Sequence, residues 1–131
     1  MIHTRLSIST RAHSELHDIT GEVEKLVAKS GIREGICTLF IPHTTCGLTI
    51  NENADPSVKK DILMELDRRF PWQDGYIHSE GNSAAHLKAS LMGFSASVPV
   101  SEGRLMLGTW QGLYLCEFDG PRSRRVIISI G

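Results

Sequence analysis

Side chains able to do chemistry gather in three polar segments, which the pattern of the sequence places at turns. The segments span residues 42–55, 78–86 and 108–125. In the first, His43 and Cys46 lie three residues apart. An imidazole and a thiol at this spacing can ligate a metal ion or act as base and nucleophile. Two residues alone do not decide between these roles.

The second segment combines histidines with oxygen-bearing side chains. His78, Glu80 and His86 supply imidazole and carboxylate ligands of the kind that Zn²⁺ accepts. Asn82 and His86 are four residues apart, so they share one face at the start of a predicted helix. Free backbone N–H groups at a helix start favour an anion such as phosphate. The alternative is a solvated loop whose asparagine caps the helix.

The third segment contains a carboxylate inside an apolar strand and a cluster of arginines. Burying a carboxylate is costly, so we expect Glu117 to be paired or directed into a site. Arg122, Arg124 and Arg125 follow at the start of the next predicted strand. Guanidinium groups bind phosphate oxygens, but we expect Arg124 and Arg125 to be solvated or at a subunit contact.

The thiols and the neighbouring tryptophan have simpler interpretations. Cys37 and Cys116 lie among apolar strand residues and are expected to be packing thiols. Cys46 lies at the predicted turn, so it is the one thiol that we expect to be a candidate for reactivity. Trp110 is expected in the core or at an interface. No chemistry is predicted for the N-terminal histidines, which are His3, His13 and His17.

Three predicted helices connect these segments. Apolar residues at helical spacing follow Asp18 or Thr20 as the cap, and Gly31 ends this helix. Asp55 as cap with proline in the next position predicts a second helix over 56–70. Asn82 or the serine after it caps a third helix, which ends at residue 93.

Strands outnumber the helices. Residues 2–9 alternate between apolar and polar, which predicts a half-buried strand. Residues 35–41 and 47–50 are predicted to form two adjacent strands around the turn that carries His43. Further strands are predicted over 95–100, 104–107, 113–118 and 124–130. Because strands do not alternate regularly with helices, we expect an α+β fold with a largely antiparallel sheet or sandwich and about three packed helices.

Composition bounds the class of protein. The 131 residues suit a single domain, 1–131. Lys and Arg number 14 against 15 Asp and Glu, a net charge of −1, so we expect neither a nucleic-acid nor a membrane partner and only a local phosphate site. Three cysteines, no secretory pattern at the N-terminus and no long apolar stretch predict a cytoplasmic chain with reduced thiols.

Taken together, the linked motifs resemble the YjbQ family over essentially the whole chain. The resemblance is carried by PHTTCGLTINENADP from residue 42, HSEGN from residue 78, HLKAS from residue 86, GTWQG from residue 108 and EFDGPR from residue 117. It implies a YjbQ-like α+β fold with a β-sandwich-like core, a homotrimer, and polar motifs gathered in a cleft near the subunit contacts. It also implies a small residue in many relatives where this chain has Cys46, which argues against a nucleophilic role.

The resemblance further implies the family's usual label, secondary thiamine-phosphate synthase. Such an enzyme joins hydroxymethylpyrimidine diphosphate to thiazole phosphate and releases pyrophosphate. The thiazole nitrogen attacks, so the reaction needs a divalent cation, donors for the departing diphosphate and an orienting pocket, and no protein nucleophile. The matching catalytic residues are His43, Glu52, Asp55, His78, Glu80, His86 and Glu117. The matching substrate-binding residues are Thr44, Asn51, Asn82, Gln111 and Arg122, to which we add Lys88.

A divalent metal ion is expected, and two ligand sets are open. Glu52, Asp55 and Glu80 could hold Mg²⁺. Alternatively, three imidazoles could hold a softer ion such as Zn²⁺, namely those of His43, His78 and His86. The sequence thus leaves two functions open: an enzyme acting on a phosphorylated small molecule, or a non-catalytic regulatory module that binds a metal or metabolite.

Overall fold

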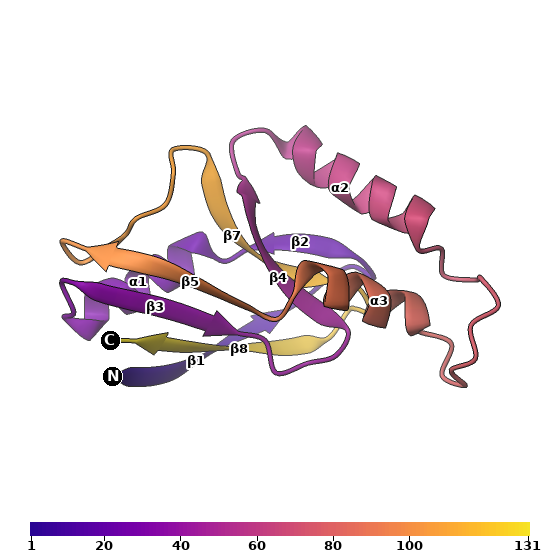
Figure 1. Ribbon diagram of the computed structural model, residues 1–131, viewed down its shortest axis with the longest axis horizontal. Coiled ribbons are helices and arrows are strands. Elements are labelled where there is room, and N and C mark those ends of the chain that lie inside the picture. Colours follow the sequence, from indigo (N-terminus) through magenta and orange to yellow (C-terminus); the bar gives the residue numbers. More distant parts are fainter.

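The computed structural model describes residues 1–131 as eight strands and three helices (Figure 1). The strands are β1 (Ile2–Ser9), β2 (Glu15–Asp18), β3 (Gly35–Phe40), β4 (Cys46–Glu52), β5 (Ser95–Ser101), β6 (Arg104–Leu105), β7 (Gln111–Glu117) and β8 (Ser123–Ile130). The helices are α1 (Thr20–Ser30), α2 (Pro56–Arg69) and α3 (Ser83–Met92). No helix is long and apolar enough to span a membrane.

The strands form two antiparallel sheets. One has the order β1-β8-β3-β5-β6 and the other the order β2-β7-β4. The first and last strands pair along their whole length, which brings the two chain termini together (Figure 1). The predicted α+β fold with mostly antiparallel strands is therefore confirmed.

Two sequence-based expectations about the strands are wrong. β3 and β4 are not adjacent, because β3 pairs with β5 and β8 while β4 pairs with β7 in the other sheet. The turn between them is thus a crossover from one sheet to the other. β2 was not predicted, because its four residues carry one apolar side chain, Leu16, and its pairing with β7 is not visible in the local pattern.

Alternation along β7 divides the interior into two apolar layers. Leu113 and Leu115 pack in a core of 17 buried residues that lies between the sheets and includes residues of α1. Tyr114 and Cys116 point the other way, into a smaller cluster under α2 and α3. Each fully buried large apolar side chain contributes about 1.5–3 kcal/mol to stability. The sheet formed by β2, β7 and β4 is thus covered by apolar side chains on both of its faces.

α2 begins at its predicted cap, whereas the N-cap position of α1 is Ile19 and not Asp18 or Thr20 as expected. The Asp55 carboxylate accepts a hydrogen bond from Ser57 N at 2.9 Å and caps α2. α3 lies against β4, and a Cβ atom at Gly47 would come within 3.0 Å of the Gly93 carbonyl oxygen. Glycine at this position therefore allows the helix to lie directly on the strand beside the loop that carries the first polar motif.

Candidate functional site

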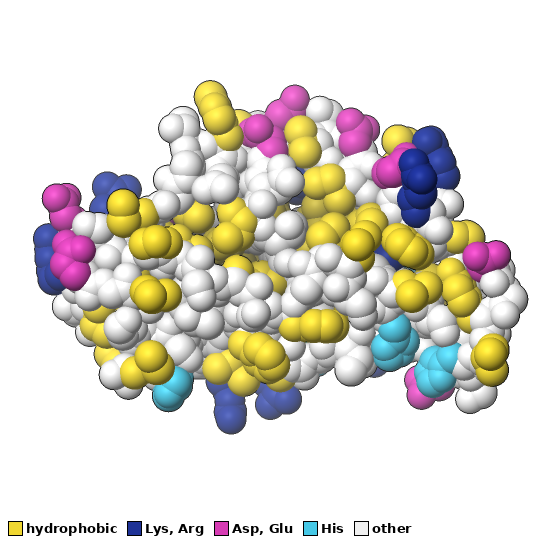
Figure 2. All heavy atoms as spheres, viewed as in Figure 1, with side chains coloured by type: hydrophobic (Ala, Val, Ile, Leu, Met, Phe, Trp, Pro, Cys, Tyr) yellow, Lys and Arg dark blue, Asp and Glu magenta, His cyan; other side chains and the backbone are white.

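Three polar segments converge on one cavity of about 470 Å³. They are the crossover between β3 and β4, residues 78–86 leading into α3, and residues 119–124 of the β7–β8 turn and the start of β8. The lining residues are Pro42, His43, Thr44, Thr45, His78, Glu80, Asn82, His86, Asp119, Arg122 and Arg124. We call this space the histidine cavity. Figure 2 shows histidine side chains grouped at the end of the molecule where α3 begins.

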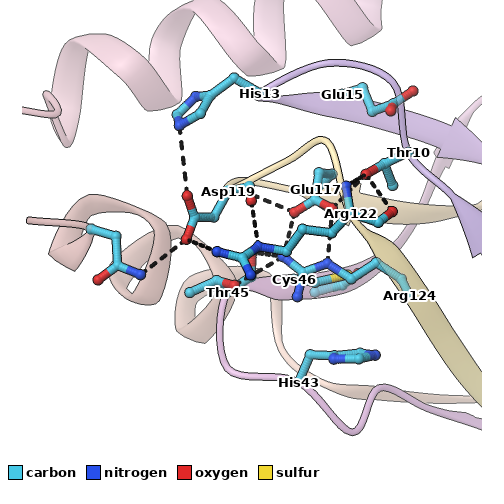
Figure 3. Close-up of polar contacts among 12 residues, drawn as sticks. Thr10, His13, Glu15, His43, Thr45, Cys46, Glu117, Asp119, Arg122 and Arg124 are labelled. Atoms are coloured by element: carbon cyan, nitrogen blue, oxygen red, sulfur yellow. Dashed lines mark hydrogen bonds and ion pairs between the residues drawn. The ribbon is translucent and has the colours of Figure 1, made fainter. Parts of the chain in front are cut away.

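A buried ion pair lies behind the wall of the histidine cavity: Arg124 lines the cavity, whereas its partner Glu117, expected to be catalytic, does not (Figure 3). Glu117 is 0% exposed, and the Arg124 guanidinium donates to both of its oxygens, from Nε to Oε1 at 2.8 Å and from Nη2 to Oε2. Thr10 Oγ1 donates to Oε1 at 2.7 Å and Asp119 N donates to Oε2 at 3.0 Å. Burial alone would raise the pKa of Glu117, but these hydrogen bonds and the charge of Arg124 outweigh burial and lower it.

Arg124 also fixes the crossover loop. Its Nη2 donates to the Thr45 hydroxyl at 2.9 Å and to the Thr45 carbonyl oxygen at 3.2 Å. The expectation that Arg124 is solvated or at a subunit contact is wrong, since it is 4% exposed. The signal was present in the sequence: Arg124 shares strand parity with Val126 and Ile128, which face the core.

His43 has a defined hydrogen-bonding state. Its Nε2 accepts a hydrogen bond from the backbone N–H of Arg125 at 2.9 Å. Burial lowers the pKa of His43, and the nearby charges of Arg124 and Arg125 lower it further. A neutral imidazole whose Nε2 accepts carries its proton on Nδ1. His43 is therefore a neutral side chain with one N–H left to donate.

Asp119 connects the elements around the cavity (Figure 3). Its Oδ2 accepts from Asn82 Nδ2 at 2.9 Å and from Arg122 Nη2 at 3.0 Å, and its carbonyl oxygen accepts from Arg122 Nε at 2.7 Å. The Asn82 side chain makes no capping bond to α3, and its buried Oδ1 has no partner. Asn82 thus joins the helix start to the β7–β8 turn, and the alternative reading of this residue as a simple cap is wrong.

The other two histidines lie close to each other. The ring centroids of His78 and His86 are 5.5 Å apart, with the ring planes at 89°. His78 Nε2 lies 3.8 Å from a carboxylate oxygen of Glu80. No group of three His, Cys, Asp or Glu side chains is arranged to hold a metal ion. The site as it stands offers imidazole, carboxylate and guanidinium groups around a space with a mostly polar lining.

Residues 4–131 match the family described as "UPF0047 protein YjbQ-like". The chain belongs to the YjbQ family. It is 52% identical over 126 residues to the UPF0047 protein YugU of Bacillus subtilis, covering 95% of this chain and 96% of that protein. A UPF0047 protein of Methanocaldococcus jannaschii is 45% identical over 126 residues, covering 96% and 91%. The resemblance inferred from the motifs is confirmed.

Solved structures of YjbQ relatives share the fold. A YjbQ/UPF0047 protein from Clostridium acetobutylicum superposes with a TM-score of 0.96 at 52% identity, covering 98% of this chain and 99% of that one. A YjbQ-like protein of unknown function from Sulfolobus solfataricus superposes with a TM-score of 0.94 at 37% identity, covering 98% and 95%. The family and fold of this chain are therefore established, whereas these names assign no activity.

Four predicted site residues of this YjbQ chain lie at the opposite end of the β4–β7 ladder from the histidine cavity. In the β4–β7 ladder, Cys46 pairs with Glu117 at the cavity end and Glu52 pairs with Gln111 at the other. Six residues of extended strand separate the two ends, a distance of about 20 Å. The residues at the far end are Asn51, Glu52, Asp55 and Gln111. The three carboxylates considered for Mg²⁺ are therefore not brought together, because only Glu80 lines the cavity.

Lys88 lies inside the YjbQ fold instead of lining the histidine cavity. It is 3% exposed and forms an ion pair with Asp67 of α2. Its ammonium also lies 5.9 Å from the centroid of the Phe118 ring. Lys88 thus ties α3 to α2 over the smaller apolar cluster.

The cysteine and tryptophan expectations have mixed outcomes. Cys37 and Cys116 are buried, as predicted. Cys46 is not an exposed turn residue: it begins β4, is 0% exposed, and burial raises the pKa of its thiol to about 12. A buried thiol that stays protonated is a poor nucleophile, so Cys46 is not a candidate reactive thiol. Trp110 is 63% exposed, which excludes the core.

Proposed function

We propose that this chain binds a phosphorylated small molecule in the histidine cavity and acts on it as an enzyme, with thiamine-phosphate synthesis as the first reaction to test. One observation carries the proposal: side chains from three separate segments meet in one cavity whose lining is mostly polar. The ion pair beneath it is fully buried and costly to maintain. Such an arrangement supports a binding site more than a solvated loop.

The cavity offers donors for phosphate oxygens. The Arg122 guanidinium is 52% exposed and directs only part of its N–H groups at Asp119. His43 has its Nδ1 proton to donate. The positive end of the α3 dipole lies beside the cavity, because Asn82 and His86 at the helix start line it. These three groups come from the three converging segments.

The chemistry of the proposed reaction matches the side chains. The C–O bond to the diphosphate breaks, a C–N bond to the thiazole forms, and pyrophosphate leaves with its charge stabilised by donors. No protein nucleophile is needed, and the cavity presents no thiol because Cys46 is buried. An adjoining cavity of about 330 Å³ includes Phe40, Ile41 and Phe94 and shares His43 with the histidine cavity, which gives a ring an apolar surface.

A bound Mg²⁺ would neutralise charge on the diphosphate. The carboxylates proposed for it, Glu52, Asp55 and Glu80, do not fit as a set, because two of them lie at the far end of β4. Glu80 and Asp119 are the carboxylates that line the cavity. They would face an ion that enters with its diphosphate ligand.

A single-turnover assay tests the enzyme proposal. Purified protein is mixed with both substrates and Mg²⁺, and thiamine phosphate is quantified. We expect product from the wild type and a loss of at least about tenfold in His78→Ala and Glu80→Ala, because each removes a cavity side chain. Asn51→Ala, at the far end of β4, is the matched control and keeps its activity. No product, or activity unchanged in both cavity variants, would contradict the proposal.

A non-catalytic metal-binding module is the second candidate. It rests on two imidazoles, because no third His, Cys, Asp or Glu side chain completes a ligand set: the ring centroids of His78 and His86 are 5.5 Å apart. Two imidazoles bound to one ion place their centroids at about this separation, given Zn–N bonds of about 2.1 Å. The three-histidine set does not fit this arrangement, because His43 uses its Nε2 as an acceptor for Arg125 N.

Elemental analysis and a zinc titration test the metal proposal. Protein purified without chelator, and apo protein titrated with Zn²⁺, should bind one equivalent per chain, and His86→Ala should lose it. His3→Ala is the control, since its imidazole contacts Ser129 and lies outside the cavity. No metal after purification and no uptake on titration would exclude this candidate.

We also propose a homotrimer. Large apolar side chains are exposed, and Figure 2 shows apolar side chains spread over one face. Among them are Phe40, Leu91 and Trp110, which are 47%, 62% and 63% exposed. Light scattering should give three times the chain mass, and a monomer would contradict the proposal.

A further inference from the structure

One guanidinium nitrogen of Arg124 takes no part in the hydrogen bonds of the buried ion pair. Nε donates to Glu117, and Nη2 donates to Glu117 and to Thr45, whereas Nη1 has no partner. Nη1 is nevertheless not enclosed, because the only enclosed side-chain nitrogen or oxygen without a partner is Asn82 Oδ1. Arg124 lines the histidine cavity, so this nitrogen faces the cavity.

The rest of the Arg124 side chain is fixed in place. Arg124 is 4% exposed, and Glu117, which holds it, is itself held by two further hydrogen bonds. Figure 3 shows the guanidinium next to Glu117 and Thr45, with the His43 ring below it. Burial alone would lower the pKa of Arg124, but the hydrogen bonds and charge of Glu117 outweigh burial and raise it. Nη1 is therefore a charged donor whose direction the fold sets before any ligand binds.

Arg122 lines the same cavity but is held differently. Its side chain is 52% exposed, and its partner is Asp119, three residues earlier in the same turn. Such a local pair moves with its turn, whereas Arg124 is bound both to β7 and to the crossover loop. A donor already held in its bound direction loses little conformational entropy on binding, so it contributes more to affinity than a mobile donor does.

The free N–H of Arg124 suits an oxyanion. Hydrogen bonds from a guanidinium to an anionic oxygen are about twice as strong as those between neutral groups. The protein supplies no such oxygen to Nη1, because the carboxylates that line the cavity, Glu80 and Asp119, do not accept from it. Since Glu117 already balances the charge of Arg124, the contribution is one directed hydrogen bond more than a general attraction for anions.

We infer that Nη1 of Arg124 donates a hydrogen bond to an oxygen of the phosphate group bound in the histidine cavity, so that Arg124 fixes where this group lies while Arg122 adds a movable charge. The inference rests on the proposed function, because it concerns the same cavity and the same class of ligand. It gives the buried ion pair a second role: Glu117 is a positioning residue that holds the donor toward the ligand.

NMR of the arginine guanidinium groups tests the inference on the wild-type protein. The Nη1 and Nη2 signals of Arg124 are assigned through bonds from its backbone, and pyrophosphate is the probe. We expect a saturable shift of the Nη1 signal that follows the same binding curve as the ring signals of His43. Arg125, the next residue of β8, is the control, and its guanidinium signals should stay in place because it does not line the cavity.

Exchange of arginine for lysine separates a directed donor from a positive charge alone. Lysine keeps the charge, but its single nitrogen cannot pair with Glu117 and also replace Nη1 in the cavity. In calorimetry, Arg124→Lys should weaken pyrophosphate binding about tenfold, and Arg122→Lys about threefold or less. Arg125→Lys, the matched control, should bind within about twofold of the wild type. Equal losses in Arg124→Lys and Arg122→Lys would overturn the directional role of Arg124.

The wild-type titration decides the question even if Arg124→Lys does not fold. It also distinguishes failure of the inference from failure of the proposed function. Shifts of the His43, His78 and His86 signals with an unchanged Nη1 signal would overturn the inference and leave the phosphate site in place. No shift in any of these signals would overturn both.

Discussion

The two ends of the β4–β7 ladder carry similar polar side chains and use them differently. At the far end, Glu52 accepts from Ala54 N and Gln111 accepts from Gly108 N, both within three residues of themselves. At the cavity end, Glu117 accepts from Thr10, which is 107 positions away, and from Arg124 on the next strand. The polar side chains at the far end thus stabilise nearby turns, whereas Glu117 at the cavity end joins separate segments of the chain.

This difference separates side chains that shape a turn from side chains that assemble a site. A local hydrogen bond between a side chain and a nearby backbone N–H needs only the turn itself. A buried carboxylate bound by groups from distant segments is maintained by the whole fold and lies where those segments meet. We therefore place the functional site at the cavity end of the ladder, and the following variants test that placement.

The largest effect is expected for Glu117→Ala. The substitution leaves the Arg124 guanidinium buried without its partner, which typically costs about 3–5 kcal/mol. Denaturant unfolding measures the loss. Glu52→Ala, at the far end, removes one turn hydrogen bond and should cost about 1 kcal/mol or less. Similar losses for the two variants would show that the ends do not differ.

The second-largest effect is expected on the affinity for pyrophosphate. Arg122→Ala should weaken pyrophosphate binding about tenfold or more, since a hydrogen bond to a charged group contributes about 1.5–3 kcal/mol. Gln111→Ala is the matched variant at the other end and should bind like the wild type in calorimetry. If Gln111→Ala weakens binding as much as Arg122→Ala does, the ligand does not belong to the cavity end alone.

A smaller effect on stability is expected at the start of α2. Asp55→Ala removes the hydrogen bond that caps the helix and should lower the midpoint of denaturant unfolding slightly without changing pyrophosphate affinity. Asp55→Asn keeps an acceptor oxygen and should recover most of the stability. If Asp55→Ala keeps its fold but binds pyrophosphate more weakly than the wild type, Asp55 belongs to the ligand site.

The smallest expected effect is a change in how the free energy of unfolding depends on pH. Because the folded state lowers the pKa of His43 below its ordinary value of 6.5, the unfolded chain takes up this proton more readily. The contribution of neutral His43 to stability is present above that value and is lost as the pH falls through the lowered folded value. Unfolding of wild type and His43→Gln between about pH 7.5 and about pH 5.5 checks this. The wild type should lose more stability on acidification, and parallel profiles would contradict the assigned state.

Local pattern predicts most of the secondary structure and little of the pairing. Alternation in β1 and the Asp55–Pro56 helix start are visible in the sequence because they depend on neighbouring residues. The partners of β3 and β4 are not visible, because they depend on which distant strands complete each sheet. The short strand β2 was missed for the same reason.

The candidate site was predicted in part. The three motif histidines do meet in one cavity, as their place in polar segments suggested. The sequence predicts no chemistry for His13, because only the fold brings residue 13 next to Asp119. Arg124 was expected to be solvated or at a subunit contact, although its alternation with Val126 places it on the core face. Spacing identified the motifs, but the hydrogen-bond partners required the structure.

The central claim is that the cavity end, not the far end, receives the phosphorylated ligand. Titration of ¹⁵N-labelled protein with pyrophosphate, followed through the histidine ring signals, tests it most directly. The account predicts saturable shifts of His43, His78 and His86, while His3 and His17 stay unchanged because neither lines the cavity. No shift in the three cavity histidines, or equal shifts in all six, would contradict it.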